Sequence, residues 1–364
     1  FEMKKRNYIT KCLLLSLLLP MLTACAGNNP HPAGSTGSAP AASSGVTSGT
    51  TAPVTEPEPP KELSKKDSLV VLRTGSNAVR DPFVLYYDGA YYIYGTGWTV
   101  MRSVKDDVTG RFTSPVKCGT PPADCIGDQW APEVHEYRGR FYMITTYKSA
   151  RTGHRGCAVF AADHPAKTFS LISDGHVTPA DWDAIDGTLY IDEEGQPWMV
   201  FVHEWTSTDD GIGRMACAKL SDDLTHFISE PVELFRADDP SWTDHCVTDG
   251  CFLYRTKGGK LLMIWSNWDK SGYAVGIAES TSGLVTGPWI QKDELLYSKD
   301  YTGEYDGGHG MIFTDGKGQL WMAIHSPNGG IKAGRVETPV LVPLKEENDA
   351  LVWDTLDRGM NGKK

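Results

Sequence analysis

The chain has 364 residues, of which 40 % are hydrophobic and 22 % charged, and its net charge is −11. The apolar fraction is enough for a packed core, which excludes a wholly disordered chain. The acidic balance argues against a nucleic-acid partner, because nucleic-acid affinity depends on neutralising phosphates. The Trp and Tyr residues are scattered rather than heptad-spaced, which favours β structure over coiled coils and helical bundles.

Residues 1–25 are typical of a bacterial lipoprotein signal peptide. Residues 4–6 are basic, residues 13–22 are apolar but too few to span a bilayer stably, and Leu22-Thr23-Ala24-Cys25 resembles a lipoprotein cleavage site. We expect lipidation of Cys25, which would anchor the protein to the bacterial cell envelope, at the outer membrane, periplasm or cell surface. The alternative is an ordinary signal peptide that contains this cysteine.

Residues 26–67 are rich in Gly, Ser, Thr, Ala and Pro, which predicts a flexible linker. Residues 68–364 are expected to form one monomeric domain. Within it, Cys118/Cys125 and Cys246/Cys251 bracket short loops in which disulfides can form in an exported protein. Free buried cysteines are the alternative.

One pattern recurs five times in this domain: a short apolar strand, a Gly-containing turn and a returning strand. Equivalent starts are separated by 52, 53, 63 and 60 residues, which is typical of the blades of a β-propeller. We therefore predict an all-β, five-bladed propeller, with a β-sandwich as the alternative. The hairpins are DPFVLYYDGAYYIYGTG (81–97), PEVHEYRGRFYMITTY (132–147), DGTLYIDEEGQPWMVFVHEW (186–205), DGCFLYRTKGGKLLMIWSNW (249–268) and GHGMIFTDGKGQLWMAIHSPN (308–328).

In a propeller the first strand of each blade lines the axis, and it starts at the same end at which the second strand finishes. Residues at these two positions should therefore converge on one face of the molecule. They are rich in carboxylates and aromatic rings, which suggests a working site rather than turn residues alone. The predicted set is Arg80, Asp81, Trp98, Trp130, Glu133, Tyr147, Asp183, Asp186, His203, Glu204, Trp205, Asp249, Trp265, Asn267, Trp268, Asp306, His309, His325 and Asn328.

Separated carboxylates in an aromatic cleft are suited to glycoside hydrolysis. One carboxylic acid protonates the leaving oxygen, while a carboxylate activates water on the opposite face of the sugar. The chain shows no nucleophilic Ser elbow, phosphate loop, dinucleotide fingerprint or His-pair metalloprotease motif.

Several motifs, in order, resemble glycoside hydrolase family 43. They are Arg80-Asp81-Pro82-Phe83, Trp130-Ala131-Pro132-Glu133-Val134, Ile185-Asp186-Gly187 and Gly308-His309-Gly310. The resemblance covers about residues 70 to 328. It implies a five-bladed propeller that cleaves arabinofuranosides, xylosides or related sugars with inversion, with galactofuranosides and galactosides kept open. It also implies that Asp81 is the general base and that Asp186 orients the acid and tunes its pKa.

The general acid is where the chain departs from the family. The family usually has Glu before a Gly-Pro pair in blade four, whereas this chain has Asp249-Gly250-Cys251. Asp249 can still be the acid, but its side chain is one methylene shorter. Glu204, at the end of the second strand of blade three, is its rival and our first choice.

We expect substrate contacts from Arg80, Trp98, Trp130, Glu133, Trp205, His309 and His325. The resemblance implies no required cofactor and allows a structural Ca²⁺ or a water cluster at His309, for which a hydrogen-bonded core His is the alternative. The competing functions are a non-catalytic glycan-binding propeller lipoprotein, in which the changed blade-four motif signals lost catalysis, and a retaining fructan-cleaving propeller.

Overall fold

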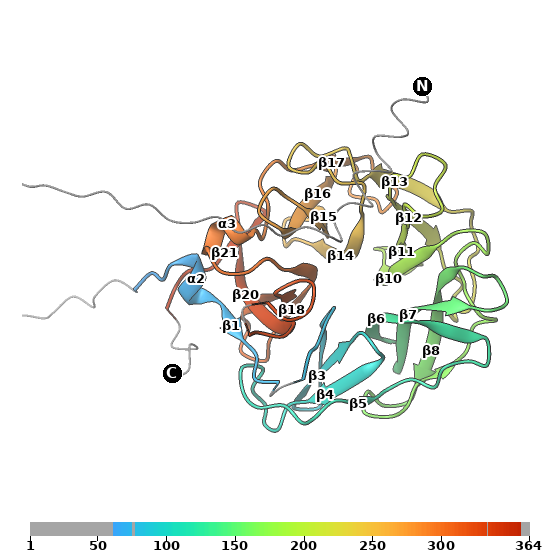
Figure 1. The fold of residues 1–364 in the computed structure, drawn as a ribbon, viewed down its shortest axis with the longest axis horizontal. Helices are drawn as coiled ribbons and strands as arrows, with labels where there is room; N and C mark the ends of the chain where they lie inside the picture. Colours follow the sequence, from blue (N-terminus) through green and yellow to red (C-terminus); the bar gives the residue numbers. More distant parts are fainter. Residues whose placement is uncertain (1–60, 75–76, 333, 358–364) are drawn as a thin grey trace, which may run out of the picture.

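Antiparallel hairpins make up almost all regular structure in the computed structural model, which describes residues 61–74, 77–332 and 334–357. The predicted signal peptide, the lipidation site Cys25 and most of the predicted linker lie outside these residues. The hairpins are grouped into five sheets that surround a common centre (Figure 1). The predicted all-β, five-bladed propeller is therefore confirmed.

The first three blades each contain four consecutive antiparallel strands, and the first strand of the blade lies at one edge of its sheet. The strands are β2 (Phe83–Tyr87), β3 (Ala90–Gly95), β4 (Thr99–Arg102) and β5 (Val116–Lys117) in blade one; β6 (Cys125–Tyr137), β7 (Arg140–Ser149), β8 (Arg155–Ala162) and β9 (Ser170–Leu171) in blade two; and β10 (Ala184–Ile191), β11 (Pro197–His203), β12 (Arg214–Lys219) and β13 (Val232–Arg236) in blade three.

Blade four repeats this pattern, whereas blade five combines strands from both ends of the domain. Two four-residue helices, α2 (Lys65–Ser68) and α3 (Lys299–Thr302), lie against each other near this blade (Figure 1). The strands are β14 (Asp249–Arg255), β15 (Leu261–Trp268), β16 (Tyr273–Ser280) and β17 (Trp289–Gln291) in blade four, and β18 (Gly308–Thr314), β19 (Leu320–Ser326), β20 (Thr338–Glu347), β21 (Ala350–Trp353) and β1 (Val70–Val71) in blade five.

The N-terminal strand β1 closes the ring by pairing with β20. Val70 lies opposite Leu341, and the Leu72 amide donates to the Pro339 carbonyl at 3.0 Å. Upstream, the Leu63 amide donates to the Thr355 carbonyl at 2.8 Å. Lys61 and Leu63 are therefore hydrogen-bonded to the domain although they precede its predicted boundary at residue 68.

The middle strands of the blades are buried on both faces because each sheet packs between two neighbours. Every residue of β3 and of β11 is buried, whereas both residues of β5, at the outer edge of blade one, are exposed. This explains why the second strands appear in the sequence as continuous apolar runs rather than as alternating patterns.

Cys118, Cys125 and Cys251 are free thiols. Neither of the two candidate disulfides, Cys118–Cys125 and Cys246–Cys251, is therefore formed. Cys251 instead directs its Sγ toward the carbonyl oxygen of Asp186, 3.4 Å away, where it acts as a small core side chain.

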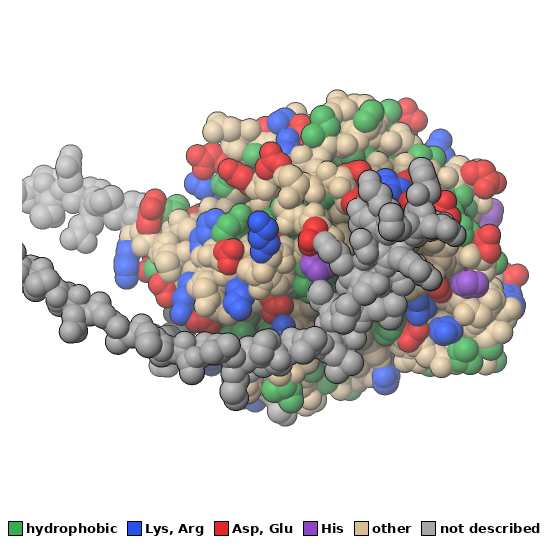
Figure 2. Space-filling model, turned by 45° about the horizontal axis from the view of Figure 1, so that its top comes forward, with side chains coloured by type: hydrophobic (Ala, Val, Ile, Leu, Met, Phe, Trp, Pro, Cys, Tyr) green, Lys and Arg blue, Asp and Glu red, His purple; other side chains and the backbone are tan. Residues whose placement is uncertain are grey.

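Acidic and basic side chains are interspersed on the face shown in Figure 2. Within the part of the chain that the structure describes, no helix is long and apolar enough to cross a membrane.

Closure by β1 can be tested with two neighbouring substitutions. Leu72→Ala is expected to lower the free energy of unfolding by about 2–4 kcal/mol, because Leu72 is 2 % exposed and its truncation leaves a cavity. Val71→Ala is the matched control and should cost less than about 0.5 kcal/mol, because Val71 is 47 % exposed. Denaturant unfolding measures both; equal effects would contradict a closing role for this segment.

Candidate active site

One residue in each of the five blades has a left-handed backbone in the innermost strand or just before it. This conformation costs an L-residue with a side chain about 1–3 kcal/mol, and such strain is concentrated at functional sites. In blades two to five the strand register also shifts at this point, as in a β-bulge, which re-aims the side chain. The residues are Asp81 (φ 55°), Ala131 (φ 40°), Asp186 (φ 56°), Gly250 (φ 41°) and His309 (φ 51°).

Three carboxylates converge on the imidazole of His309. Its Nδ1 lies 3.3 Å from Asp81 Oδ1, 3.8 Å from Asp186 Oδ2 and 3.8 Å from Asp249 Oδ1. The side chains of Asp81 and Asp186 are 6 % and 4 % exposed, whereas that of Asp249 is 15 % exposed. The predicted convergence of strand starts is therefore confirmed for these four residues.

Asp81 is held in its charged form. Burial raises its pKa, but His309, His325 and Arg80 together outweigh burial and hold the pKa of Asp81 well below its usual range. His325 Nδ1 lies 3.2 Å from Oδ1, and Thr96 Oγ1 donates to Oδ2 at 2.5 Å. A carboxylate that stays ionised is suited to accept a proton from water.

Asp186 has the opposite environment. Burial raises its pKa well above the usual value, and the negative charge and hydrogen bond of Asp249 and the charge of Asp81 act in the same direction. The Gly250 amide, which donates to Asp186 Oδ2 at 3.0 Å, opposes this only in part. Neighbouring carboxyls whose pKa values are pushed apart are typical of acid–base sites.

Asp249 is fixed by the phenol of Tyr273, which donates to Oδ2 at 2.6 Å. Tyr273 is completely buried and stacks on His325, with 5.5 Å between the ring centroids. Because His325 also contacts Asp81, the side chains that support Asp249 and Asp81 pack directly on each other.

Glu204 follows the end of β11 and is held by a guanidinium group. Arg155 Nε donates to Oε2 at 2.7 Å, and the side chain of Glu204 is 7 % exposed. Burial is the largest influence and raises the pKa of Glu204, Arg155 opposes this, and the negative charges of Asp183 and Asp249 raise the pKa further. The pKa of Glu204 therefore depends on the charge of Asp249 as well as on burial and on Arg155.

Two of the predicted substrate contacts, Arg80 and Trp130, lie beside these groups. Arg80 Nε is 3.4 Å from Asp81 Oδ1, and its Nη1 also binds Glu337 and Asn328 at 2.6 and 2.9 Å. The guanidinium carbon Cζ of Arg155 lies over the Trp130 ring, 5.5 Å from the centroid of that ring.

Glu133 and Trp205 contact residues outside the cluster formed by Asp81, Asp186, Asp249 and His309. Glu133 is buried and its Oε2 pairs with His135 Nε2 at 2.9 Å. Trp205 is half-buried against a small apolar cluster that contains Ile212 and Cys246.

Two predicted substrate contacts are wrong. Trp98 is completely buried and packs edge-on against Tyr147 and Phe160, because the turn after β3 directs it into the core. His325 is also completely buried, so it supports Asp81 instead of touching a sugar.

Arg155 and Tyr273 were not predicted as site residues, although both contact candidate carboxylates. Each is the first residue of the third strand of its blade, β8 and β16. In an antiparallel sheet the third strand starts at the same end as the first. The sequence argument considered only the starts of first strands and the ends of second strands. It would have found both residues had it included the starts of third strands.

The five-bladed propeller and its clustered carboxylates are suited to a hydrolase that works by acid–base catalysis. Residues 74–345 match Glycosyl hydrolases family 43. The extracellular exo-alpha-(1->5)-L-arabinofuranosidase ArbA of Cellvibrio japonicus is 26 % identical over 241 residues, which cover 59 % of this chain and 67 % of that protein. The probable arabinan endo-1,5-alpha-L-arabinosidase A of Emericella nidulans is 24 % identical over 264 residues, which cover 69 % and 76 %.

Among solved structures, an endo-arabinase from Bacteroides thetaiotaomicron matches with a TM-score of 0.66 and 35 % identity, covering 77 % of this chain and 98 % of that chain. The chain therefore belongs to glycosyl hydrolase family 43 and is a glycosidase that acts on carbohydrate.

The environment of Asp186 predicts a measurable cost to stability. Asp186→Asn is expected to raise the melting temperature by a few degrees at about pH 7.5 and to leave it nearly unchanged at about pH 4. Because the pKa of Asp186 is raised in the folded state, the wild type loses stability as pH rises above the unfolded value of about 3.9. A neutral amide does not incur this loss.

Thermal unfolding at the two pH values measures this difference. Asp181→Asn, at an exposed position that precedes the same strand, is the control and should melt like the wild type at both. Equal melting temperatures for the wild type and Asp186→Asn at about pH 7.5 would show that Asp186 carries no electrostatic penalty.

Proposed function

We propose that this glycosidase hydrolyses α-1,5-linked L-arabinofuranosyl bonds in arabinan or its oligosaccharides, with inversion at the anomeric carbon. The proposal rests on the ionised Asp81 facing carboxyls whose pKa values are raised. The substrate is suggested by the relatives, since all three are named for arabinan or for α-1,5-arabinofuranosyl bonds. Xylosides and galactofuranosides remain the competing substrates.

In the proposed reaction, Asp81 accepts a proton from water as the water attacks the anomeric carbon. A second carboxyl group, on the other side of the sugar, gives its proton to the leaving oxygen. Asp81 suits the first role because His309, His325 and Arg80 keep it charged. Arg80 is itself fixed by Glu337, so this charge stays beside Asp81.

We assign the role of general acid to Glu204. Its Oε2 is bound to Arg155, but no hydrogen bond or ion pair to Oε1 is made by the residues that the structure describes. Its raised pKa favours the protonated form that an acid needs. Asp249 is the rival, but its Oδ2 accepts from Tyr273 and its Oδ1 faces His309.

In this assignment Asp186 and Asp249 act together as a tuning pair. The raised pKa of Asp186 favours its protonated form beside Asp249. Burial, and to a smaller extent the negative charges of Asp183 and Asp249, raise the pKa of Glu204, which favours a protonated Glu204 at a pH at which Asp81 is ionised.

We also propose that hydrolysis needs no cofactor and that a structural Ca²⁺ can be held on the axis. Ligand atoms of Asp186, Asp249 and His309 lie within 4.8 Å of one another. Two carboxylate oxygens suit Ca²⁺, whereas an imidazole nitrogen suits it less well, and water would have to complete a shell of about six to eight ligands. A bound cation would lower the repulsion among the carboxylates, while the chemical steps belong to the chain's own residues.

For the cellular setting we propose a monomer displayed on the bacterial envelope by a lipid on Cys25. The support is the sequence of residues 1–25 and the linker-like composition that follows. A tether of this kind would let the catalytic domain reach polysaccharide beyond the membrane surface.

Asp81→Asn is expected to lower kcat on linear α-1,5-arabinan by about 10²- to 10⁴-fold, because the amide cannot accept the proton of water. Reducing-sugar release measures the rate, and Asp174→Asn, at a side chain that is 99 % exposed, is the control. Proton NMR of the first product should show inverted anomeric configuration. A retained configuration, or turnover by Asp81→Asn at the wild-type rate, would remove Asp81 from the role of general base.

Glu204→Gln and Asp249→Asn should differ in their dependence on the leaving group. A variant that lacks the acid loses about 10²- to 10⁴-fold on arabino-oligosaccharides, whose leaving alcohol needs a proton, but much less on a 2,4-dinitrophenyl arabinofuranoside. We expect this pattern for Glu204→Gln and a similar loss on both substrates for Asp249→Asn. The reverse pattern would transfer the role of acid to Asp249.

A further inference from the structure

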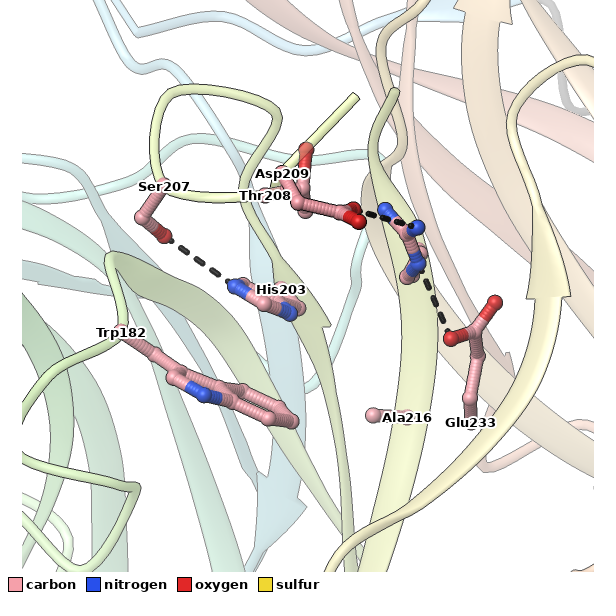
Figure 3. A pocket seen from close by; sticks show the side chains of 8 residues that line it. Trp182, His203, Ser207, Thr208, Asp209, Ala216 and Glu233 are labelled. Atoms are coloured by element: carbon pink, nitrogen blue, oxygen red, sulfur yellow. Dashed lines mark hydrogen bonds and ion pairs between the residues drawn. The ribbon is translucent and has the colours of Figure 1, made fainter. Parts of the chain in front are cut away.

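A pocket of about 360 Å³ lies in blade three, outside the carboxylate cluster (Figure 3). This volume is at the lower end of the roughly 300–1,000 Å³ typical of small-molecule sites. Its walls come from the loop before β10, from the end of β11 and the turn that follows, and from β12 and β13. The lining residues are Trp182, His203, Ser207, Thr208, Asp209, Arg214, Ala216 and Glu233.

One wall of this pocket is aromatic and uncharged. The half-buried Trp182 stacks on His203, with 3.8 Å between ring centroids and 5° between the ring planes. Ser207 Oγ lies 3.2 Å from His203 Nε2 and holds the imidazole at its edge (Figure 3). Burial and the charge of Arg214 lower the pKa of His203 to about 4, so the ring is neutral at neutral pH.

The opposite wall is polar and rigid. Arg214, whose side chain is 12 % exposed, donates to Glu233 at 2.9 Å, to Asp210 at 3.0 Å and to Asp209 at 3.3 Å. Arg236 also binds Asp210, at 2.8 Å, so three carboxylates face two guanidinium groups here, and the excess of negative charge disfavours an anion in the pocket. Asp209 and Glu233 are themselves exposed and have acceptor oxygens for ligand hydroxyls.

A neutral ring with an apolar face and several hydroxyls matches these two walls. Its C–H face can lie against Trp182 and its hydroxyls can bond to the Arg214–Glu233 pair. A purely apolar ligand would leave that ion pair desolvated without new partners. The chemistry therefore favours a sugar residue.

The pocket adjoins Glu204, the proposed general acid, through residues that are neighbours in the chain. His203 immediately precedes Glu204, and Trp182 immediately precedes Asp183. Asp183 is tied to the same turn, since its amide donates to Ser207 Oγ at 2.8 Å and its carbonyl accepts from the Glu204 amide at 2.8 Å. A sugar bound here would lie close to Glu204 but outside the cluster of Asp81, Asp186, Asp249 and His309.

We propose that this blade-three pocket binds one sugar residue of the polysaccharide away from the bond that is cleaved. The identification of that sugar as L-arabinofuranose rests on the proposed function. The pocket therefore favours the polymer over short substrates, because only a long chain can occupy it and the axial site together.

The test measures polysaccharide binding apart from cleavage. In the Asp81→Asn protein, Trp182→Ala should weaken binding to linear α-1,5-arabinan by roughly tenfold, as expected for the loss of an aromatic anchor. Glu233→Ala, at an exposed position that should not impair folding, should weaken it severalfold. Trp289→Ala in β17 and Glu279→Ala in β16, both in blade four and outside the lining of this pocket, are the controls and should bind normally.

Kinetics in the otherwise wild-type protein complete the test. For Trp182→Ala, the loss in kcat/KM on arabinan should exceed the loss on an aryl arabinofuranoside by about the same tenfold factor. Equal losses on the two substrates would show that Trp182 acts only through the fold or through Glu204, and would overturn the inference.

Failure of the substrate assignment gives a different result. A wild type that binds and cuts galactan or xylan but not arabinan would overturn arabinan as the substrate, and the same variants would then be compared on that polymer. The pocket inference is overturned if Trp182→Ala and Glu233→Ala bind every polysaccharide as tightly as their parent does, or if the parent binds none.

Discussion

The active site depends on holding Asp81, Asp186 and Asp249 together around the imidazole of His309. Charges of one sign held this close in a poorly solvated place cannot all remain ionised. The influences on the carboxyl pKa values are unequal: His309, His325 and Arg80 lower the pKa of Asp81, whereas burial and the neighbouring Asp249 raise the pKa of Asp186. The result is one carboxyl that stays charged and one that keeps its proton. A hydrolase that works by acid–base catalysis needs such a separation of protonation states.

The propeller brings these like-charged side chains together because every blade contributes the start of one strand to the axis. The left-handed backbone of Asp81, Asp186 and His309 is unfavourable for each residue alone. It persists because a hairpin that is buried on both sides holds each strand in place. Packing in the blades therefore supports both the backbone strain and the electrostatic penalty at the centre, which is the usual relation between stability and activity.

Hairpin spacing was sufficient to predict the blades, and antiparallel geometry was sufficient to predict that Asp81, Asp186, Asp249 and His309 would meet. Those predictions succeed because both properties follow from chain direction and period alone. Trp98 and His325 were assigned to the cleft by the same rule, but whether a strand-end side chain faces the cleft or the core depends on turn conformation and on neighbouring blades. Arg155 and Tyr273 show a different omission, since third strands also start at this face. The free state of Cys118, Cys125 and Cys251 reflects tertiary placement, which loop length does not determine.

The departure from the family pattern in blade four concerns side-chain length: the shorter carboxylate is at Asp249 in blade four, and the longer one is at Glu204 in blade three. Asp249 is one methylene shorter than the family's usual Glu, and its carboxylate is fixed close to the axis by Tyr273. Glu204 comes from the end of a second strand, extends one bond further, and is aimed by the guanidinium of Arg155. A short carboxylate that stays within the cluster raises the pKa of the longer one. The Asp at position 249 is therefore compatible with retained catalysis, because its charge helps to keep the neighbouring carboxyl protonated.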